Sequence, residues 1–278
     1  MEDLENNDAP RGSETPRDET SQTKPPFREG DELPPAAQTD QPLARSEVSE
    51  PWRPGEKEEQ LAQSFRDQPP TAIDRQDRST VSFVVDNGDS KAVFKPDASG
   101  ADRELAAYGT DQMLGFDRVP TTARTELEVD GVPTRGSLQE WKEADVPREY
   151  VRDFADDSSR QGLQSQQMAV LDYVIANRDR GDGNFLTHGG DLVAFDNADS
   201  FPPPGPDGEI TSNFVGGWLD RELRPEIVDS ANATAPDAYR SMLTGCGIDG
   251  PAADAAVARL REVQGGKITG SAFEGRIF

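Results

Sequence analysis

The first quarter of the chain lacks the side chains from which a hydrophobic core is built. Residues 1–70 contain no isoleucine and a single valine, Val48, but they hold 11 of the 22 prolines together with 17 acidic and 8 basic residues. Such a segment buries too little apolar surface to offset the conformational entropy lost on folding. We therefore expect residues 1–74 to form a disordered, acidic, proline-rich tail that contributes little to stability. The folded domain is expected at 75–278.

Charge and cysteine content argue against several classes of protein. The net charge is −24, and a surface with this acid excess repels nucleic acid and anionic membranes. The start, "MEDLENNDAP", has no basic region followed by an apolar run, and no later stretch is apolar enough to span a bilayer. One cysteine, Cys246, excludes an internal disulfide framework. We expect a cytoplasmic protein with no membrane span and no nucleic-acid partner.

Sequence patterns after residue 75 predict a small antiparallel sheet and one helix. The stretch "STVSFVVDNGDSKAVFKP" at 79–96 has two β-rich runs around an Asn-Gly pair, a strong hairpin signal. A helix is predicted at 99–115, with Ser99 as its N-cap and Gly115 as its stop. A second hairpin, with its turn at an Asp-Gly pair, is predicted at 121–141.

Beyond Trp141 the pattern becomes helical. The stretch "LQSQQMAVLDYVIANRD" at 163–179 spaces apolar residues by three and four, which indicates a helix with one apolar face. A short hairpin ending at Asp196 is predicted next, around a Gly-Gly turn. Two more helices are predicted at 236–245 and 250–264.

The segment between the long helix and the short hairpin, "NRDRGDGN" at 177–184, is densely polar. A surface turn accepts this composition, because Asn, Asp and Gly satisfy their own backbone locally. A calcium loop does not fit. Counted from Asn177, the positions that need a ligand, a glycine and a bidentate acid hold Gly181, Asp182 and His188. The remaining interpretation is a catalytic loop.

Phosphoryl transfer needs a cation on the nucleotide phosphates, metal ligands, and a carboxylate that orients the acceptor. The sequence offers these groups in a sensible order. Lys95 ends a predicted strand, and Glu104 follows nine residues later on a helix that could pack behind the sheet and pair with it. Asp179 and Asn184 share one loop, and Asp196 ends the next hairpin. We expect Asp179, Asn184 and Asp196 to converge on one cleft.

At these residues the chain resembles the atypical kinases related to phosphatidylinositol 3/4-kinases and to the HipA-type bacterial serine/threonine kinases. Their catalytic loop runs N-x-D-R-H-x-x-N, and their metal-binding aspartate ends a strand. The matching loop residues here are Asn177, Asp179, Arg180 and Asn184. The segments "AVFKP", "RELAAY" and "GSLQEW" resemble the lysine strand, the glutamate helix and the hinge between the lobes. The resemblance covers about residues 80–202.

The resemblance implies an α+β, two-lobed protein-kinase-like fold. A small antiparallel sheet plus helix would form an N-lobe at about 75–140, and a mainly helical C-lobe would follow at about 141–278. The implied activity is the transfer of the ATP γ-phosphate to a hydroxyl group with the help of Mg²⁺. The acidic surface argues against an anionic lipid as acceptor, which leaves a protein Ser or Thr, including those of the chain's own tail.

The resemblance also implies roles for single residues. Lys95 would bind the α- and β-phosphates, Glu104 would hold Lys95, and adenine would bind the backbone near Gln139 and Glu140. The residues implied for the metal are Asn184 and Asp196. The residues implied for catalysis are Asp179, which positions the acceptor, with Asn177 and Arg180. Each also has an ordinary alternative as a strand-end lysine, a solvated helix acid or part of a polar turn.

The sequence departs from the family in two places. Gly181 stands where those kinases have a histidine that supports the loop or the transferring phosphate. Its absence leaves a second interpretation open, a nucleotide-binding pseudokinase that acts as a regulatory or interaction module. No glycine-rich G-x-G-x-x-G loop is present either, so the Asn87-Gly88 turn would have to cover the phosphates.

Overall fold

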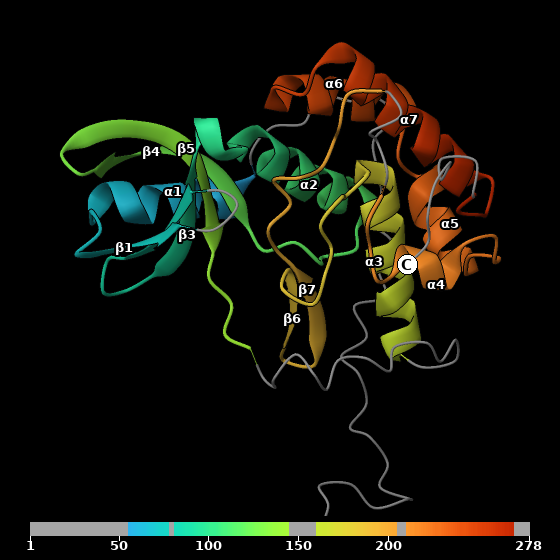
Figure 1. The fold of residues 1–278 in the computed structure, drawn as a ribbon, viewed down its shortest axis with the longest axis horizontal. Coiled ribbons are helices and arrows are strands. Elements are labelled where there is room, and N and C mark those ends of the chain that lie inside the picture. The colour runs from blue at the N-terminus through green and yellow to red at the C-terminus, as the bar shows by residue number, and fades with distance from the viewer. Residues whose placement is uncertain (1–54, 78–80, 145–159, 205–209, 270–278) are drawn as a thin grey trace, which may run out of the picture. The chain divides into compact units, whose positions relative to one another are not determined.

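The structure, a computed structural model of the 278-residue chain, describes residues 55–77, 81–144, 160–204 and 210–269 (Figure 1). Within these residues, the helices are α1 (Glu56–Asp67), η1 (Asp97–Ser99), α2 (Ala101–Leu114), α3 (Arg160–Ile175), α4 (Val215–Trp218), α5 (Pro225–Asn232), α6 (Pro236–Cys246) and α7 (Gly250–Gln264). The strands are β1 (Ala72–Asp77), β2 (Val81–Asp86), β3 (Lys91–Pro96), β4 (Thr122–Val129), β5 (Val132–Glu140), β6 (Phe185–His188) and β7 (Asp191–Ala194).

The first five strands form one antiparallel sheet in the order β1-β2-β3-β5-β4 (Figure 1). The two-residue period of the strands places Phe83 and Val85 of β2 on the same face as Ala92 and Phe94 of β3, where Leu138 of β5 joins them in one buried cluster. Both predicted hairpins are present, as β2–β3 and β4–β5.

Helix α1 covers this apolar face. Its residues Leu61 and Phe65 pack against the cluster of the sheet, and Phe65 is fully buried. The first turn is acidic, which suits the positive end of the helix dipole. One of its acids, Glu58, accepts a hydrogen bond from the hydroxyl of Tyr108 on α2.

The prediction that a disordered tail extends to residue 74 is wrong for residues 55–74. These residues form α1 and the beginning of β1, an edge strand paired with β2. The average composition of residues 1–70 concealed them. A helix needs only a few apolar residues on one face when a sheet is available to receive them. Residues 1–54 lie outside the described part of the chain.

Helix α2 is present as predicted, but its N-cap differs. Ser99 ends η1, and the cap is Gly100 with φ of 90°, a conformation that glycine adopts without strain. A Cβ at Gly100 would lie 2.9 Å from the Cβ of Ala198, so the position also permits a close approach to the segment after β7. At the other end Gly115 has φ of 68° and stops the helix as predicted.

The C-terminal part of the chain is built around α3 (Figure 1). The apolar face predicted from the spacing within 163–179, formed by Met168, Leu171 and Ile175, is buried, but so are the residues between them. A helix buried all round is a central helix, and α3 contacts α2, α4, α7 and β7. The two helices predicted near the C-terminus are present as α6 and α7, while α4 and α5 were not predicted.

Within the described ranges, none of the helices combines the length and the apolarity that a membrane crossing requires.

The packing of α1 can be tested by truncating Phe65. We expect Phe65→Ala to lower the free energy of unfolding by about 3 to 5 kcal/mol, because the change leaves a cavity between α1 and the sheet. Denaturant unfolding measures this. Lys57→Ala, an exposed position of the same helix, is the control and should have little effect.

A pair of truncations tests the same point. Removal of residues 1–70 should lower the melting temperature well below that of a protein lacking only residues 1–54. Equal melting temperatures would show that α1 is not part of the folded domain.

Candidate active site

Lys95 of β3 joins two carboxylates. Because Ala92 and Phe94 face the core, Lys95 lies on the opposite face of the sheet. Its Nζ lies 2.5 Å from Oε1 of Glu104 on α2 and 2.6 Å from Oδ1 of Asp196. Burial disfavours the charged ammonium, but Glu104 and Asp196 together raise the pKa of Lys95 above its ordinary value. The pairing of Lys95 with Glu104, predicted from their spacing, is present.

Asp196 follows β7 and is the more accessible of the two carboxylates. Its side chain is 29% exposed, whereas that of Glu104 is 3% exposed. Its backbone has a left-handed φ of 55°, which is uncommon for a residue with a side chain. Asp196 thus presents one oxygen to Lys95 and keeps access to solvent.

The polar loop starts where α3 ends. Ala176 takes a left-handed φ of 50°, and buried Asn177 follows. The Oδ1 of Asn177 accepts a hydrogen bond from the backbone N–H of Asp179 at 2.8 Å. Asn184 donates from Nδ2 to the carboxylate of Asp179 at 3.0 Å and to its backbone oxygen at 2.6 Å. Asn184 thus holds the exposed carboxylate of Asp179, while Asn177 holds the backbone of the same residue.

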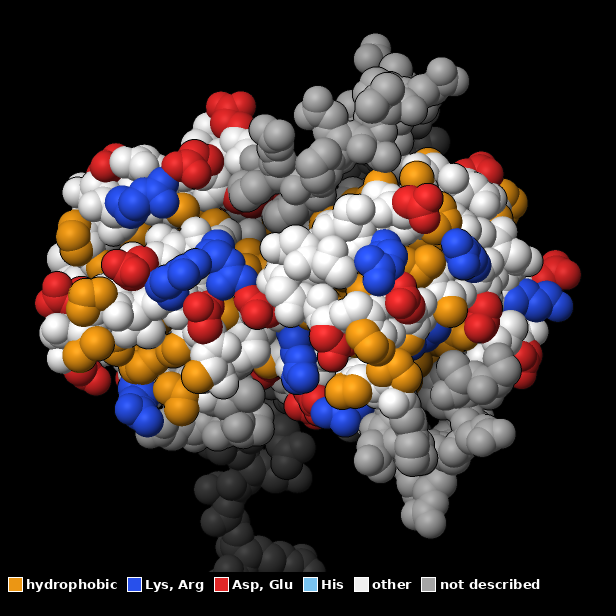
Figure 2. Space-filling model, turned by 90° about the horizontal axis from the view of Figure 1, so that it is seen from above, with side chains coloured by type: hydrophobic (Ala, Val, Ile, Leu, Met, Phe, Trp, Pro, Cys, Tyr) orange, Lys and Arg blue, Asp and Glu red, His pale blue; other side chains and the backbone are white. Residues whose placement is uncertain are grey.

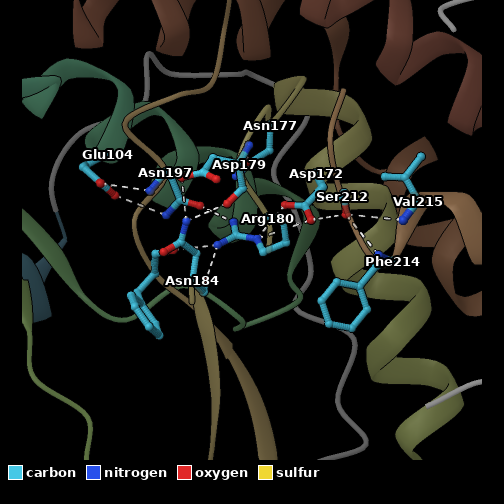
Figure 3. Close-up of polar contacts among 11 residues, drawn as sticks. Glu104, Asp172, Asn177, Asp179, Arg180, Asn184, Asn197, Ser212, Phe214 and Val215 are labelled. Atoms are coloured by element: carbon cyan, nitrogen blue, oxygen red, sulfur yellow. Dashed lines mark hydrogen bonds and ion pairs between the residues drawn. The ribbon is translucent and has the colours of Figure 1, made fainter. Parts of the chain in front are cut away.

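Arg180 is turned into the protein and is fully buried (Figure 3). Its Nε donates to Asp172 at 3.0 Å, and its Nη1 donates to the backbone oxygens of Asn184 and Phe195, at 2.6 Å each. Its Nη2 donates to Oδ1 of Asn197. The expectation that Arg180 acts catalytically is therefore corrected. It holds the loop from behind, and a sequence pattern cannot show which way an arginine points.

The partner of Arg180, Asp172, was not found by sequence analysis. Burial raises the pKa of Asp172, while the Arg180 guanidinium and the hydroxyl of Ser212, 2.7 Å away, oppose this shift. Ser212 in turn accepts the backbone N–H groups of Phe214 and Val215 at 3.2 and 3.3 Å (Figure 3). The available signal was the lone acid within the apolar run "AVLDYVI", since buried acids are almost always paired.

Gln139 and Glu140 end β5. The Nε2 of Gln139 donates to the hydroxyl of Thr122 at 3.0 Å. The backbone N–H of Glu140 donates to the oxygen of Thr121 at 2.9 Å, so this predicted donor to adenine is already bonded within the sheet.

The Asn87-Gly88 turn does not cover the site. It joins β2 to β3 at the Lys91 end of β3, and Lys95 lies four residues away, roughly 13 Å along the strand. Asn87 instead fixes the turn to α1 through a bond from its Nδ2 to the oxygen of Ser64.

Gly181 leaves room for a side chain. A Cβ built at this position meets no atom within 4 Å, and the loop is held by Arg180 on one side and by Asn184 on the other. The loop conformation therefore does not depend on a histidine at 181.

The oxygen atoms around Asn184 and Asp196 suit a hard divalent cation. In the described ranges no group of three or more His, Cys, Asp or Glu forms a metal cage. Mg²⁺, however, usually takes one or two protein ligands plus phosphate oxygens and water. Because Nδ2 of Asn184 donates to Asp179, its amide oxygen is the atom left to accept. One amide oxygen and one carboxylate fit this requirement.

No protein-family model and no curated protein matches the chain. Solved structures do match. The Golgi casein kinase with Mn/ADP bound aligns with a TM-score of 0.50 and 17% identity, over 78% of this chain and 76% of that one. The fold is protein-kinase-like. A hydra Fam20 structure with sugar matches with a TM-score of 0.48 and 13% identity, over 73% of this chain and 86% of that one. The Helicobacter pylori proinflammatory kinase CtkA matches with a TM-score of 0.44 and 10% identity, over 71% of this chain and 94% of that one.

At these identities the matches show the fold alone. The match to the Golgi casein kinase confirms the predicted two-lobed α+β architecture, with an antiparallel sheet and helix followed by a mainly helical part. Within this fold the candidate residues form one connected set. Lys95 bonds Glu104 and Asp196, and Asn184 bonds Asp179. The backbone oxygen of Asn184 accepts the N–H of Phe195, next to Asp196.

The structural role of Arg180 can be tested by its removal. Arg180→Met leaves Asp172 buried without its counterion, so we expect a loss of about 3 to 5 kcal/mol in the free energy of unfolding. Arg178→Met is the matched control in the same loop. Its pair with Asp199 is partly exposed, so its loss should cost roughly 1 kcal/mol or less. Similar losses in both variants would contradict the assigned role.

Proposed function

We propose that the protein is an ATP- and Mg²⁺-dependent phosphotransferase that moves the γ-phosphate to a hydroxyl group, with a protein Ser or Thr as the favoured acceptor. The observation that carries the proposal is the buried Lys95, bonded to both Glu104 and Asp196 within a protein-kinase-like fold. The same fold in the Golgi casein kinase holds Mn and ADP.

In this proposal some residues of the chain bind the nucleotide and its metal, and one residue orients the acceptor. Lys95 supplies a fixed positive charge for the α- and β-phosphates, and Glu104 keeps it aimed. Asn184 and Asp196 would hold Mg²⁺, which when bound neutralises charge on the phosphate oxygens. Asp179 presents an exposed carboxylate that orients the acceptor hydroxyl and receives its proton. Asn184 bonds this carboxylate, and Asn177 bonds the backbone N–H of Asp179. Adenine would bind the backbone after β5.

A relation to the phosphatidylinositol 3/4-kinase and HipA-type families is part of the proposal. It is supported by the loop pattern from Asn177 to Asn184 and by the order of the lysine strand, glutamate helix and metal aspartate. A cytoplasmic location remains a proposal based on the single cysteine.

A protein acceptor is favoured over a lipid by the surface charge. Net charge is −24, and on the face shown in Figure 2 the Lys and Arg side chains of the coloured residues alternate with Asp and Glu. The described residues of that face form no extended basic surface of the kind that attracts anionic lipid.

The second candidate is a nucleotide-binding pseudokinase, favoured by Gly181. In the resembled kinases the residue at this position supports the loop or the transferring phosphate, and glycine supplies neither function. The loop is nevertheless held in place by Arg180. The two candidates therefore differ in turnover, while both predict nucleotide binding.

Nucleotide binding is tested by Lys95→Met, which removes the charge but keeps the length of the side chain. We expect ATP affinity in the presence of Mg²⁺ to fall at least about tenfold, as for the loss of a hydrogen bond to a charged group. Calorimetry measures it. Lys267→Met, at an exposed lysine after α7, is the control. Unchanged affinity in Lys95→Met would refute the proposed cleft.

Turnover is tested with γ-labelled ATP at low and at molar salt. We expect label on the protein's own Ser or Thr residues, or slow ATP hydrolysis, and loss of both in Asp179→Ala and Asp196→Ala. Only Asp196→Ala should also lose metal-dependent binding, since Asp179 orients the acceptor.

Tight binding without turnover at any salt would favour the pseudokinase. Gly181→His is then the variant to assay, because a Cβ at position 181 meets no atom within 4 Å and the change restores the family residue.

A further inference from the structure

Asn197, which follows the metal aspartate, joins three parts of the site. It is fully buried, and its side chain lies between Glu104 of α2 and Arg180 of the loop (Figure 3). Its Nδ2 donates to Oε2 of Glu104 at 3.2 Å, and its backbone N–H donates to Oε1 of Glu104 at 2.9 Å. Its Oδ1 accepts from Nη2 of Arg180.

The chemistry of these partners requires an amide at 197. An ionised carboxylate only accepts hydrogen bonds and a guanidinium only donates them. The residue between Glu104 and Arg180 must therefore donate on one side and accept on the other. A side-chain amide does both at a fixed separation. Aspartate would face Glu104 without a donor, and leucine would satisfy neither partner.

Glu104 has no other described side-chain partner besides Lys95 and Asn197. Its Oε1 accepts from Lys95 and from the N–H of Asn197, and its Oε2 accepts from Nδ2 of Asn197. Asp196 bonds Lys95 directly. The dipeptide Asp196-Asn197 thus contacts both members of the lysine–glutamate pair.

Two more contacts join α2 to the same segment. Arg103 donates from Nη1 to the backbone oxygen of Ala198 at 3.0 Å, and Gly100 allows the close approach to Ala198 described above. The first turn of α2 is therefore held against residues 196–198 at several points.

We propose that Asn197 is a positioning residue that couples α2 to the catalytic loop, so that Lys95 and Asp196 take their places together. The inference rests on the proposed function for its effect on ATP. In protein kinases the lysine–glutamate pair and the metal aspartate must both be in place for activity. Here one buried amide makes the position of the glutamate depend on that of the segment carrying the aspartate.

The test exchanges donor and acceptor across the contact. Asn197→Asp places a carboxylate against Glu104, Glu104→Gln removes the acceptor of that contact, and the double variant N197D/E104Q restores one donor and one acceptor at unchanged net charge. We expect each single variant to lower the melting temperature and the double variant to recover most of the loss. Losses that add up in the double variant would overturn the proposal.

Nucleotide affinity separates positioning from mere stability. At a temperature where circular dichroism shows every variant folded, Asn197→Ala should weaken ATP binding about tenfold, which corresponds to about 1.4 kcal/mol. Asn232→Ala, at an exposed asparagine ending α5, should leave it unchanged. Affinity in Asn197→Ala within about twofold of the wild type would overturn the coupling.

The two proposals fail in different ways. A wild-type protein that binds no nucleotide would refute the proposed function, and the melting temperatures of the exchange variants would then decide the coupling of α2 to the loop by themselves.

Discussion

A guanidinium that is fully buried must find its hydrogen-bond acceptors inside the protein, because an unpaired buried charge is too costly to tolerate. Arg180 meets this requirement with a carboxylate from α3, two backbone oxygens and the amide oxygen of Asn197. These acceptors come from both ends of the β6–β7 hairpin and from the helix before the loop. Arg180 thus joins the loop, the two ends of the β6–β7 hairpin and the segment that holds Asp196 and Asn197.

This arrangement explains how the loop keeps its shape with glycine at 181. Support comes from behind, through Arg180 and Asp172, and continues through Ser212 to the start of α4. On the cleft side Asn177 and Asn184 fix Asp179. The loop therefore keeps the placement of Asp179 on which its proposed role in orienting an acceptor depends. What glycine removes is an imidazole that could act on the phosphate, which is a question of chemistry rather than of folding.

Local sequence patterns predicted the structural features that depend on residues close together in the chain. The Asp130-Gly131 turn has positive φ at both residues, as a tight hairpin requires, and the nine residues from Lys95 to Glu104 do bring the pair together. Contacts between distant segments were not predictable in this way. The use of α1 as a cover depends on a sheet that follows it in the chain, and the bond between Glu104 and Asn197 spans 93 residues.

The sequence also did not show whether a side chain of the polar loop points into the protein or toward solvent. Arg180 and Asp179 are adjacent in a polar loop, yet one side chain is buried and the other is exposed. Composition is the same for a loop that faces outward and for one that is anchored inward.

The left-handed backbone of Ala176 and Asp196 affects how many conformations the site can adopt. Neither residue is a glycine, so each dihedral costs about 1 to 2 kcal/mol relative to the right-handed form. Glycine would relieve that cost, but it would also admit many more backbone conformations at Ala176, where the loop begins, and at Asp196. With side chains at both positions, the chain tolerates local strain and in return restricts the site to a narrow set of shapes.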